Sequence, residues 1–391
     1  MSDPSDRADG VRQRNLARLV RIVHVEGPQS RAALTEATGL NRSTIAGLVG
    51  ELVREGLVEE RPPDPARRVG RPSPVVAASP GVAAIAVNPE VDAVTIGAVG
   101  FDQRILVRER IAVDRLVTPA ETAALTAGTI ARWRGAALAG IRLAGIGLAV
   151  PGLVRSDDGL VRDAPHLAWH DAPVRELVED ATGLPTVADN DATLGSLAEH
   201  LYGAARGVDD VVYLNGGASG IGGGLIVHGI AVSGAGGYAG EFGQNRPGIA
   251  AESDRRAPRG VLEDEVNRAL LLGAVGLGPT DDAALAAAVA ASADPRVDAE
   301  LARQRRILAT SLANAVNVLN PSVVVLGGFL TIVAGDLDEL TAAVRTQTMP
   351  ACGEQLEIRL ALLAEDRLLI GAAEAAFAPL LRDPVGLPAA A

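Results

Sequence analysis

The sequence predicts a mixed α/β protein with two parts, a small N-terminal winged helix-turn-helix and a larger α/β body. In residues 30–60, SRAALTEATGLNRSTIAGLVGELVREGLVEE, two short helical patterns flank a tight turn and lead into a strand pattern. From about residue 81, short apolar strand patterns alternate with helical ones. A chain of 391 residues exceeds the usual ~100–200 residues of one domain, so we expect a head with its linker at 1–80 and a body at 81–391.

The helical patterns of residues 30–54 have clear starts and stops. Ser30 is a favourable N-cap, and Gly39 supplies the left-handed position that ends a helix. After Asn41, a second helix with one buried face is predicted by apolar residues at the i, i+3, i+4 spacing: Ile45, Leu48, Val49, Leu52 and Val53. The residues expected on its outer face, which suits a DNA major groove, are Arg42, Ser43, Thr44 and Gly47. An ordinary helical hairpin is the alternative interpretation.

The segments on either side complete a winged domain. Upstream, a third helix is predicted by the apolar stripe Leu16, Leu19, Val20 and Val23. Downstream, RRVGRPSP connects Val58 to a second apolar run at 75–78, as in the hairpin of a wing. We expect three arginines at its tip to contact phosphates or a minor groove: Arg67, Arg68 and Arg71. An arginine run alone is more often a solvated loop, but with the helices it predicts operator DNA as a partner.

Charge is divided unequally between the two parts. Residues 1–80 hold 12 Arg against 10 Asp plus Glu, whereas the remainder holds 24 against 38, which accounts for the net charge of −12. We therefore expect the acidic body to be held away from DNA, and binding to depend on individually placed arginines.

Composition excludes several classes of protein. The sequence contains no lysine, so a lysine-bearing phosphate loop, a Schiff-base site and a pyridoxal phosphate site are absent. Cys352 is the only cysteine, which excludes an internal disulfide and fits a reducing cytoplasm. The N-terminus has no apolar signal region, and the alanine-rich stretch at 283–293 is too short to cross a bilayer, so we expect a cytoplasmic protein without membrane contact.

The body is expected to begin after a disordered segment at 1–10 and a wing and linker at 61–80. Three strands at its start form a meander. The expected elements follow as strands 82–87, 93–99 and 105–111, a helix at 120–134, a buried strand in GIGLAVPGLV, a strand at 186–188, a helix at 192–201, strands 210–214 and 223–227, helices within 262–291 and 304–319, and a strand at 323–326.

Polar residues follow the strand in VADNDA, where Asn190 and Asp191 can point into a cleft; the alternative is that Asp191 only caps the next helix. With VADNDA, the segments LNGGASGIGGGLIVHG, GGYAGEFGQ and GVLE resemble the ROK family of sugar kinases and sugar-responsive repressors. The resemblance covers roughly residues 81–380. It implies a two-lobed actin/hexokinase-like (ribonuclease H-like) fold, with lobe 1 at about 81–190 plus a C-terminal helix and lobe 2 at about 191–365.

The resemblance also implies a sugar site. Asp191 matches the catalytic base of the kinases, Glu241 and Glu263 match sugar-binding glutamates, and the glycine-rich loop matches the family's phosphate loop. Carboxylates suit a polyol because they accept strong hydrogen bonds from hydroxyls. The effector-binding residues expected are Asn190, Asp191, Glu241, Gln244, Glu263 and His166. Trp169 is expected either to offer an apolar face to the sugar or to pack internally.

Two departures from the family pattern limit the chemistry. Where members have an Asp-x-Gly-Gly-Thr phosphate loop, this chain has VNPEVDAVT, whose Pro89, Glu90 and Asp92 remove a donor and add negative charge. We therefore expect Asp191 to be a vestigial base, and the chain not to be an enzyme. In place of the family's histidine and cysteine zinc ligands stand Gln244, Asp254, Arg256 and Val261, so we expect neither metal nor cofactor.

These inferences predict a sugar-responsive transcriptional regulator, most often a repressor in this family, with activation left open. We expect a homodimer or homotetramer on a pseudo-palindromic operator, with 304–319 either at the subunit interface or packed within a lobe. An ATP-dependent sugar kinase carrying a DNA-binding head is the first alternative, because Asn190, Asp191 and the glycine loop are retained. A sensor of a non-sugar ligand is the second.

Overall fold

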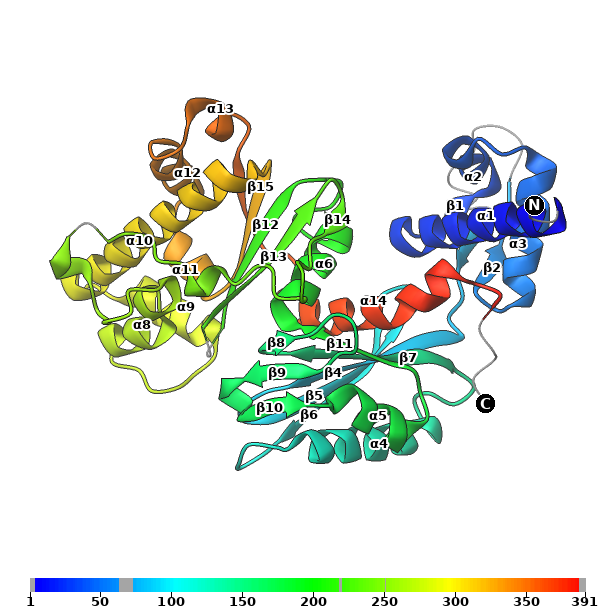
Figure 1. Cartoon of the computed structure of the whole chain (residues 1–391), viewed down its shortest axis with the longest axis horizontal. Helices are drawn as coiled ribbons and strands as arrows, with labels where there is room; N and C mark the ends of the chain where they lie inside the picture. The colour runs from blue at the N-terminus through cyan, green and yellow to red at the C-terminus, as the bar shows by residue number, and fades with distance from the viewer. Residues whose placement is uncertain (1–3, 63–72, 218–219, 250, 387–391) are drawn as a thin grey trace.

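The computed structural model describes residues 4–62, 73–217, 220–249 and 251–386. The head contains α1 (Pro4–Glu26), α2 (Arg31–Thr38) and α3 (Arg42–Arg54), with the short strands β1 (Gln29–Ser30), β2 (Val58–Arg61) and β3 (Val75–Ala78) in the order β1-β3-β2. This is the winged helix-turn-helix predicted from the sequence (Figure 1).

The two predicted caps of the head are confirmed: Ser30 Oγ accepts the Ala33 N–H at 3.0 Å, and Gly39 has φ 71°. The Asn41 side chain, which was expected only in the turn, caps α3. Two expectations were wrong. Residues 4–10 belong to helix α1 and are not disordered, and Val53 is 40% exposed because the buried stripe of α3 ends at Leu52.

The body contains two five-stranded sheets of the same topology. The first has the order β11-β7-β4-β5-β6 and the second β14-β13-β12-β15-β16. In each, three consecutive antiparallel strands are extended by two parallel ones. The strands of the first sheet are β4 (Val82–Pro89), β5 (Ala93–Gly100), β6 (Ile105–Ala112), β7 (Arg142–Val150) and β11 (Thr186–Asn190). Those of the second are β12 (Val211–Gly216), β13 (Ile221–Val227), β14 (Ile230–Ala231), β15 (Val323–Gly328) and β16 (Glu357–Leu360).

Helices cover both faces of each sheet. Helices α4 (Pro119–Arg134) and α5 (Val174–Thr182) pack outside the first sheet, and α14 (Arg367–Arg382) packs on its inner face. Helix α6 (Asp191–Tyr202) covers the inner face of the second sheet and packs against α14. The remaining helices of the second half are α7 (Leu262–Glu265), α8 (Arg268–Val275), α9 (Asp282–Ala291), α10 (Pro295–Leu319), α11 (Leu330–Ala334), α12 (Leu337–Arg345) and α13 (Pro350–Gly353).

Short elements complete the fold. A small antiparallel sheet beside the first large one, missed at the sequence level, consists of β8 (Leu153–Val154), β9 (Val161–Ala164) and β10 (Trp169–Ala172). The 3-10 helices are η1 (Pro165–Leu167), η2 (Phe242–Gln244), η3 (Glu252–Asp254) and η4 (Ala364–Asp366). None of the helices in the described ranges is long and apolar enough to span a membrane.

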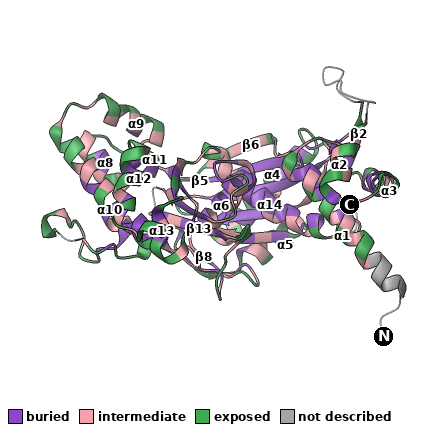
Figure 2. Ribbon diagram, turned by 90° about the horizontal axis from the view of Figure 1, so that it is seen from above, coloured by how far each residue is buried: buried purple, intermediate pink, exposed green. Residues whose placement is uncertain are grey.

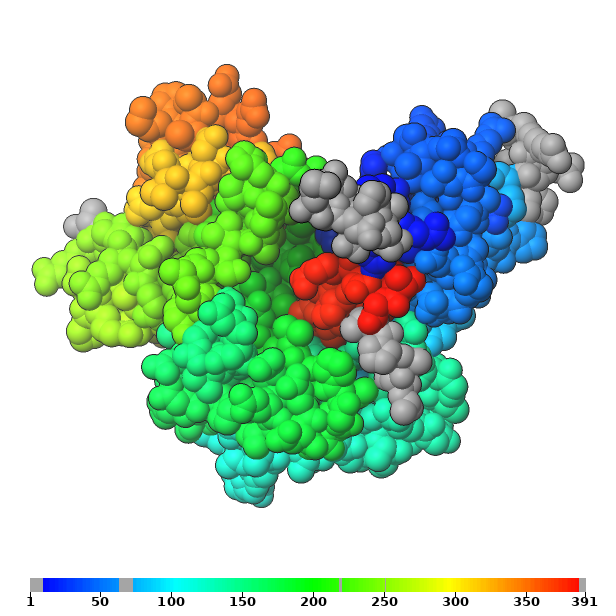
Figure 3. Space-filling view, turned by 45° about the vertical axis from the view of Figure 1, so that its right-hand side comes forward, coloured from blue at the N-terminus to red at the C-terminus, as the bar shows by residue number. Residues whose placement is uncertain are grey.

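The head and the body share one hydrophobic core. Buried side chains of α1, such as Leu19 and Val23, belong to the same cluster as Phe101 of the body and Phe377 of α14. Only residues 79–81 separate β3 from β4. Apolar burial therefore joins α1 directly to α14, a contact that the sequence did not predict. Figure 2 shows the buried ribbon of α14, and Figure 3 shows its red surface against the blue head.

Candidate functional site

All six residues expected to bind an effector line one cavity of about 720 Å³. The first half of the body contributes Asn190 and His166, and the second contributes Asp191, Glu241, Gln244 and Glu263. Further polar residues of the lining, which the motif comparison did not single out, are Asp163, Asn215, Arg259, Asp264 and Asn267. Arg259 and Asp264 directly precede and follow the GVLE motif, so this motif was the sequence signal from which both could have been found.

Asn190 and Asp191 lie where β11 ends and α6 begins. The Asn190 side chain accepts the Thr193 N–H at 3.0 Å and donates to Gly152 O at 2.9 Å. Asn190, and not Asp191, is therefore the N-cap of α6, which removes the capping alternative for Asp191. The Asp191 carboxylate accepts the adjacent Ala192 N–H at 2.8 Å and lines the cavity, so it retains acceptor capacity there.

Burial makes these carboxyl groups weaker acids than usual. Burial raises the pKa of Asp191 to about 6, against a weaker opposing effect of the Ala192 N–H. The pKa of Glu241 is also raised, first by burial and then by the charges of Glu263 and Asp191. Uncompensated carboxylates in a cavity favour a ligand whose hydroxyls donate hydrogen bonds.

Glu263 is held in place from three sides. Gln244 Nε2 donates to its Oε1 at 2.6 Å, and the Ile221 N–H approaches Oε2 at 3.4 Å. Arg259 Nη2 lies 3.6 Å from Oε1 and is bound more closely to Asp264. Gly220 has φ 145°, and a Cβ there would lie 2.4 Å from Glu263 Oε2, so the glycine loop permits this close approach.

The two aromatic candidates of the β9–β10 region differ. His166 is exposed and lines the cavity from η1. Trp169 is only 3% exposed, and its Nε1 donates to Val117 O at 2.8 Å. The suggestion that Trp169 stacks on a sugar is therefore wrong, because the ring lies in the core and its polar atom is satisfied there.

The segment VNPEVDAVT forms a tight β4–β5 hairpin. The Glu90 N–H donates to Ala93 O at 2.8 Å, and Thr95 Oγ1 donates to the Glu90 carboxylate at 3.1 Å. Burial raises the pKa of Glu90, while Thr95 and Arg110 oppose the shift. The hairpin also carries the carboxylate of Asp92, and Arg110 approaches both carboxylates.

The residues that replace the family's zinc ligands do not form a metal site. Val261 is buried and apolar, and the carboxylate of Asp254 is paired with Arg306 at 3.0 Å. Across residues 4–386, apart from the gaps in the description, no three His, Cys, Asp or Glu side chains cluster as metal ligands. The residues present do not fit zinc.

A buried polar junction joins the body to the head. His24 of α1 is 1% exposed, with Nε2 2.7 Å from Glu374 Oε1 of α14 and Nδ1 2.7 Å from Phe101 O. Tyr202, the last residue of α6, donates its hydroxyl to the same Glu374 oxygen at 2.8 Å. This junction was not predicted from the sequence, because Glu374 lies 350 residues from His24 and no local pattern links them.

The outer face of α3 is positioned as predicted for most of its residues. Arg42, Ser43 and Gly47 are exposed, whereas Thr44 is half-buried. Ser43 Oγ donates to Asn41 Oδ1 at 2.7 Å, so it is partly engaged in the cap. The wing arginines Arg67, Arg68 and Arg71 lie outside the described residues.

The chain belongs to the ROK family, whose model matches residues 85–378. A putative xylose repressor of Caldicellulosiruptor sp. (strain Rt8B.4) is 24% identical over 401 residues, which cover 96% of this chain and 98% of the relative. A glucokinase of Halalkalibacterium halodurans is 30% identical over 255 residues, 59% of this chain and 74% of the relative. The fold is also that of a ROK family transcriptional regulator of known crystal structure, a homologue of the E. coli MLC protein. The alignment covers 95% of this chain and 97% of the regulator, with a TM-score of 0.75 and 23% identity.

Replacing Asp191 by Asn tests the cost of the buried carboxyl. A raised pKa means that folding favours the protonated form, so unfolding free energy falls as pH rises from about 4 to about 6. We expect Asp191→Asn to be more stable than the parent protein by roughly 1–3 kcal/mol at pH 7 and nearly equal at pH 4, in urea unfolding.

Asp189→Asn is the matched control. Burial also raises the pKa of Asp189 to about 6, but Asp189 does not line the cavity. Both variants should therefore gain stability at pH 7, while only Asp191→Asn lowers the affinity for a bound sugar. Equal affinities of the two variants would contradict the assignment of Asp191 to the site.

Proposed function

We propose that the chain is a sugar-responsive transcriptional repressor: the head binds operator DNA, and the cavity binds a sugar effector without phosphorylating it. The observation that carries this proposal is the convergence of the six expected residues on one cavity in a body that shares its core with a DNA-binding head. Two relatives that align along more than 90% of this chain, a putative xylose repressor and the xylose repressor of Caldicellulosiruptor bescii, support it. We also propose that the protein is cytoplasmic and binds a pseudo-palindromic operator as a homodimer or homotetramer. Each chain would consist of a head with its linker at 1–80, a first lobe at about 81–190 plus α14, and a second lobe at about 191–365.

The absence of catalysis follows from the β4–β5 hairpin. Phosphoryl transfer requires donors and a metal around the γ-phosphate, whereas this hairpin carries the carboxylates of Glu90 and Asp92, which are paired with Arg110. Asp191 then has no reaction in which to act as a base. The rival proposal, a kinase with a DNA-binding head, is favoured by the glucokinase relative and the retained Asn190 and Asp191.

A coupled phosphorylation assay with ATP and magnesium over a panel of pentoses and hexoses separates the two. We expect turnover at background, while at least one sugar raises the melting temperature, since ligand at 100 times its Kd stabilises by about 2.7 kcal/mol. Turnover that disappears in Asp191→Ala would instead establish the kinase. If no sugar of the panel raises the melting temperature and a non-sugar ligand does, the result would favour a sensor of a non-sugar ligand.

Helix α6 supplies a route from the cavity to the head. Its first residue, Asp191, lines the cavity, and its last, Tyr202, contacts Glu374 at the junction with His24. A ligand that shifts Asp191 would move Tyr202 with the helix, because a hydrogen-bonded helix transmits displacement along its axis. Regulation requires the sugar to prefer one arrangement of the head by about 1–3 kcal/mol.

Tyr202→Phe removes one hydrogen bond of the junction and keeps the ring. We expect sugar affinity to stay within about twofold, while the sugar-dependent change in operator affinity, on the order of 5- to 150-fold, falls several-fold. Fluorescence anisotropy with and without sugar measures both. Tyr213→Phe, which removes a buried tyrosine hydroxyl of β12 outside the junction, is the control; equal loss in both variants would refute the route.

Arg42→Ala tests the docking of α3 on DNA. The side chain is exposed at the start of the proposed recognition helix, so we expect operator affinity to fall by about 1–3 kcal/mol if Arg42 contacts a base edge. A phosphate contact would instead reduce the salt dependence by about one unit of slope. An operator selected from random duplex DNA serves as probe, and Arg296→Ala, an exposed arginine of α10, serves as control. Identical affinities for both variants and the parent would exclude this docking.

A further inference from the structure

One wall of the cavity is built from a segment with little regular structure. Residues 252–267 contain only η3 and the short α7, yet they supply four cavity residues: Arg259, Glu263, Asp264 and Asn267. Because few backbone hydrogen bonds hold this segment, the positions of these side chains depend on what anchors its inner side.

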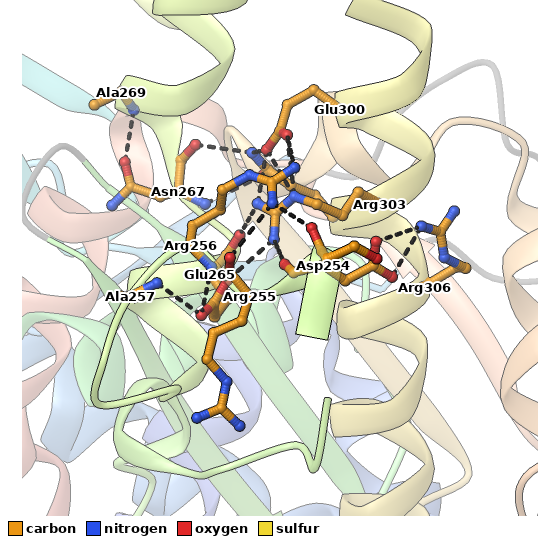
Figure 4. Close-up of polar contacts among 12 residues, drawn as sticks. Asp254, Arg255, Arg256, Ala257, Glu265, Asn267, Ala269, Glu300, Arg303 and Arg306 are labelled. Carbon is orange, nitrogen blue, oxygen red and sulfur yellow. Dashed lines mark hydrogen bonds and ion pairs between the residues drawn. The ribbon is translucent and has the colours of Figure 1, made fainter. Parts of the chain in front are cut away.

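The anchor is a buried ion pair between the segment and α10. Glu265 is fully buried, and Arg303 of α10 is 2% exposed, with Nη1 3.1 Å from Glu265 Oε2. Arg303 Nη2 donates to Glu265 O at 2.6 Å and to Glu300 at 2.7 Å, Nη1 also donates to Asp254 O at 2.7 Å, and Nε donates to Glu300 at 3.0 Å. All five N–H groups of the guanidinium are thus engaged (Figure 4).

The Glu265 carboxylate closes the segment on itself. It accepts the backbone N–H groups of Arg256 at 2.8 Å and Ala257 at 3.0 Å in addition to the Arg303 bond. The start of the segment, at Asp254–Ala257, is thereby tied to its end at Glu265. Figure 4 shows these bonds converging from the loop and from α10.

Neighbouring residues of α10 extend the anchor to the cavity. Gln304 is fully buried; its Nε2 donates to Asn267 O at 3.1 Å, and its Oε1 accepts the Asn267 N–H at 3.2 Å. Asn267 Nδ2 donates to Glu263 O at 3.1 Å. Burial alone would raise the pKa of Glu300, but hydrogen bonds from Arg303 and Gln304 lower it, so this carboxylate stays charged beside Arg303.

We propose that Arg303 and Glu265 are positioning residues of the cavity: their buried ion pair, the clasp, holds Glu263, Arg259 and Asn267 in the geometry that receives the effector. The clasp occupies the segment in which the family's zinc ligands are replaced, and it anchors that segment without a metal. A buried ion pair adds little stability over an apolar pair of the same volume. The contribution of this pair is therefore to fix the geometry of the segment. The role in effector binding rests on the proposed function; the ordering of residues 252–267 does not.

The test uses the full-length protein with Arg303→Met, and with Arg303→Met combined with Glu265→Leu. Arg303→Met leaves a buried carboxylate unpaired and should lower the melting temperature, whereas the double variant removes that charge and should recover most of it. In both variants we expect amide exchange of Asp264 and Val266, whose N–H groups bond within the segment and not to the clasp, to rise at least tenfold, with β12 and β15 unchanged. Affinity for D-xylose or D-glucose, whichever gives the larger thermal shift, should fall at least tenfold in both.

The controls separate positioning from simple stability. Arg306→Met removes an exposed arginine of the same helix that pairs with Asp254, and it should change exchange and affinity less than twofold. Excess chelator should leave the parent protein unchanged. If sugar affinity and loop exchange recover in the double variant together with the melting temperature, or if the chelator reproduces the defect, the proposal is overturned. If neither sugar binds the parent protein, the proposed function loses its support, and the exchange measurement alone still decides the clasp.

Discussion

The close packing of α14 between the two large sheets is the constraint on which the rest of the structure depends. A Cβ at Gly147 of β7 would lie 1.8 Å from Ala372 O of α14, and one at Gly371 of α14 would lie 2.1 Å from Leu194 O of α6. Only glycine allows these backbones to approach so closely. Since α1 of the head also packs on α14, the two lobes and the head all meet at this helix.

This arrangement places the cavity and the head at opposite ends of α6. The carboxyl groups at the cavity end are kept from full solvation, and the junction at the other end buries His24 and Glu374 away from water. Buried polar groups tolerate few alternative arrangements, because each displaced partner leaves an unsatisfied donor or acceptor. A body with these two buried clusters is suited to a small number of discrete states, as regulation requires.

The parts predicted well from the sequence are those that local patterns encode. The caps at Ser30 and Gly39, the buried face of α3 up to Leu52 and most strands of the two large sheets follow from spacing over a few residues. The packing of α1 on α14 was not predicted, because the Pro-rich composition of 61–80 does not reveal that the head and the body share a core. The choice between the two roles expected for Trp169 also needed the structure, since an aromatic side chain beside a cleft has the same sequence signature whether it faces the cavity or the core.

By itself, the sequence determined the class of each part, because helix caps and periodicity depend on neighbours in the chain, and its motifs, through their resemblance to the ROK family, indicated six residues of the cavity. Tertiary structure decided which charges are buried together. The partners Arg303 and Glu265 lie 38 residues apart and His24 and Glu374 lie 350 apart, and no local spacing links them. Their pairing follows from the folding of distant helices onto common cores, where a buried charge must find a partner and only the final packing determines which one is within reach.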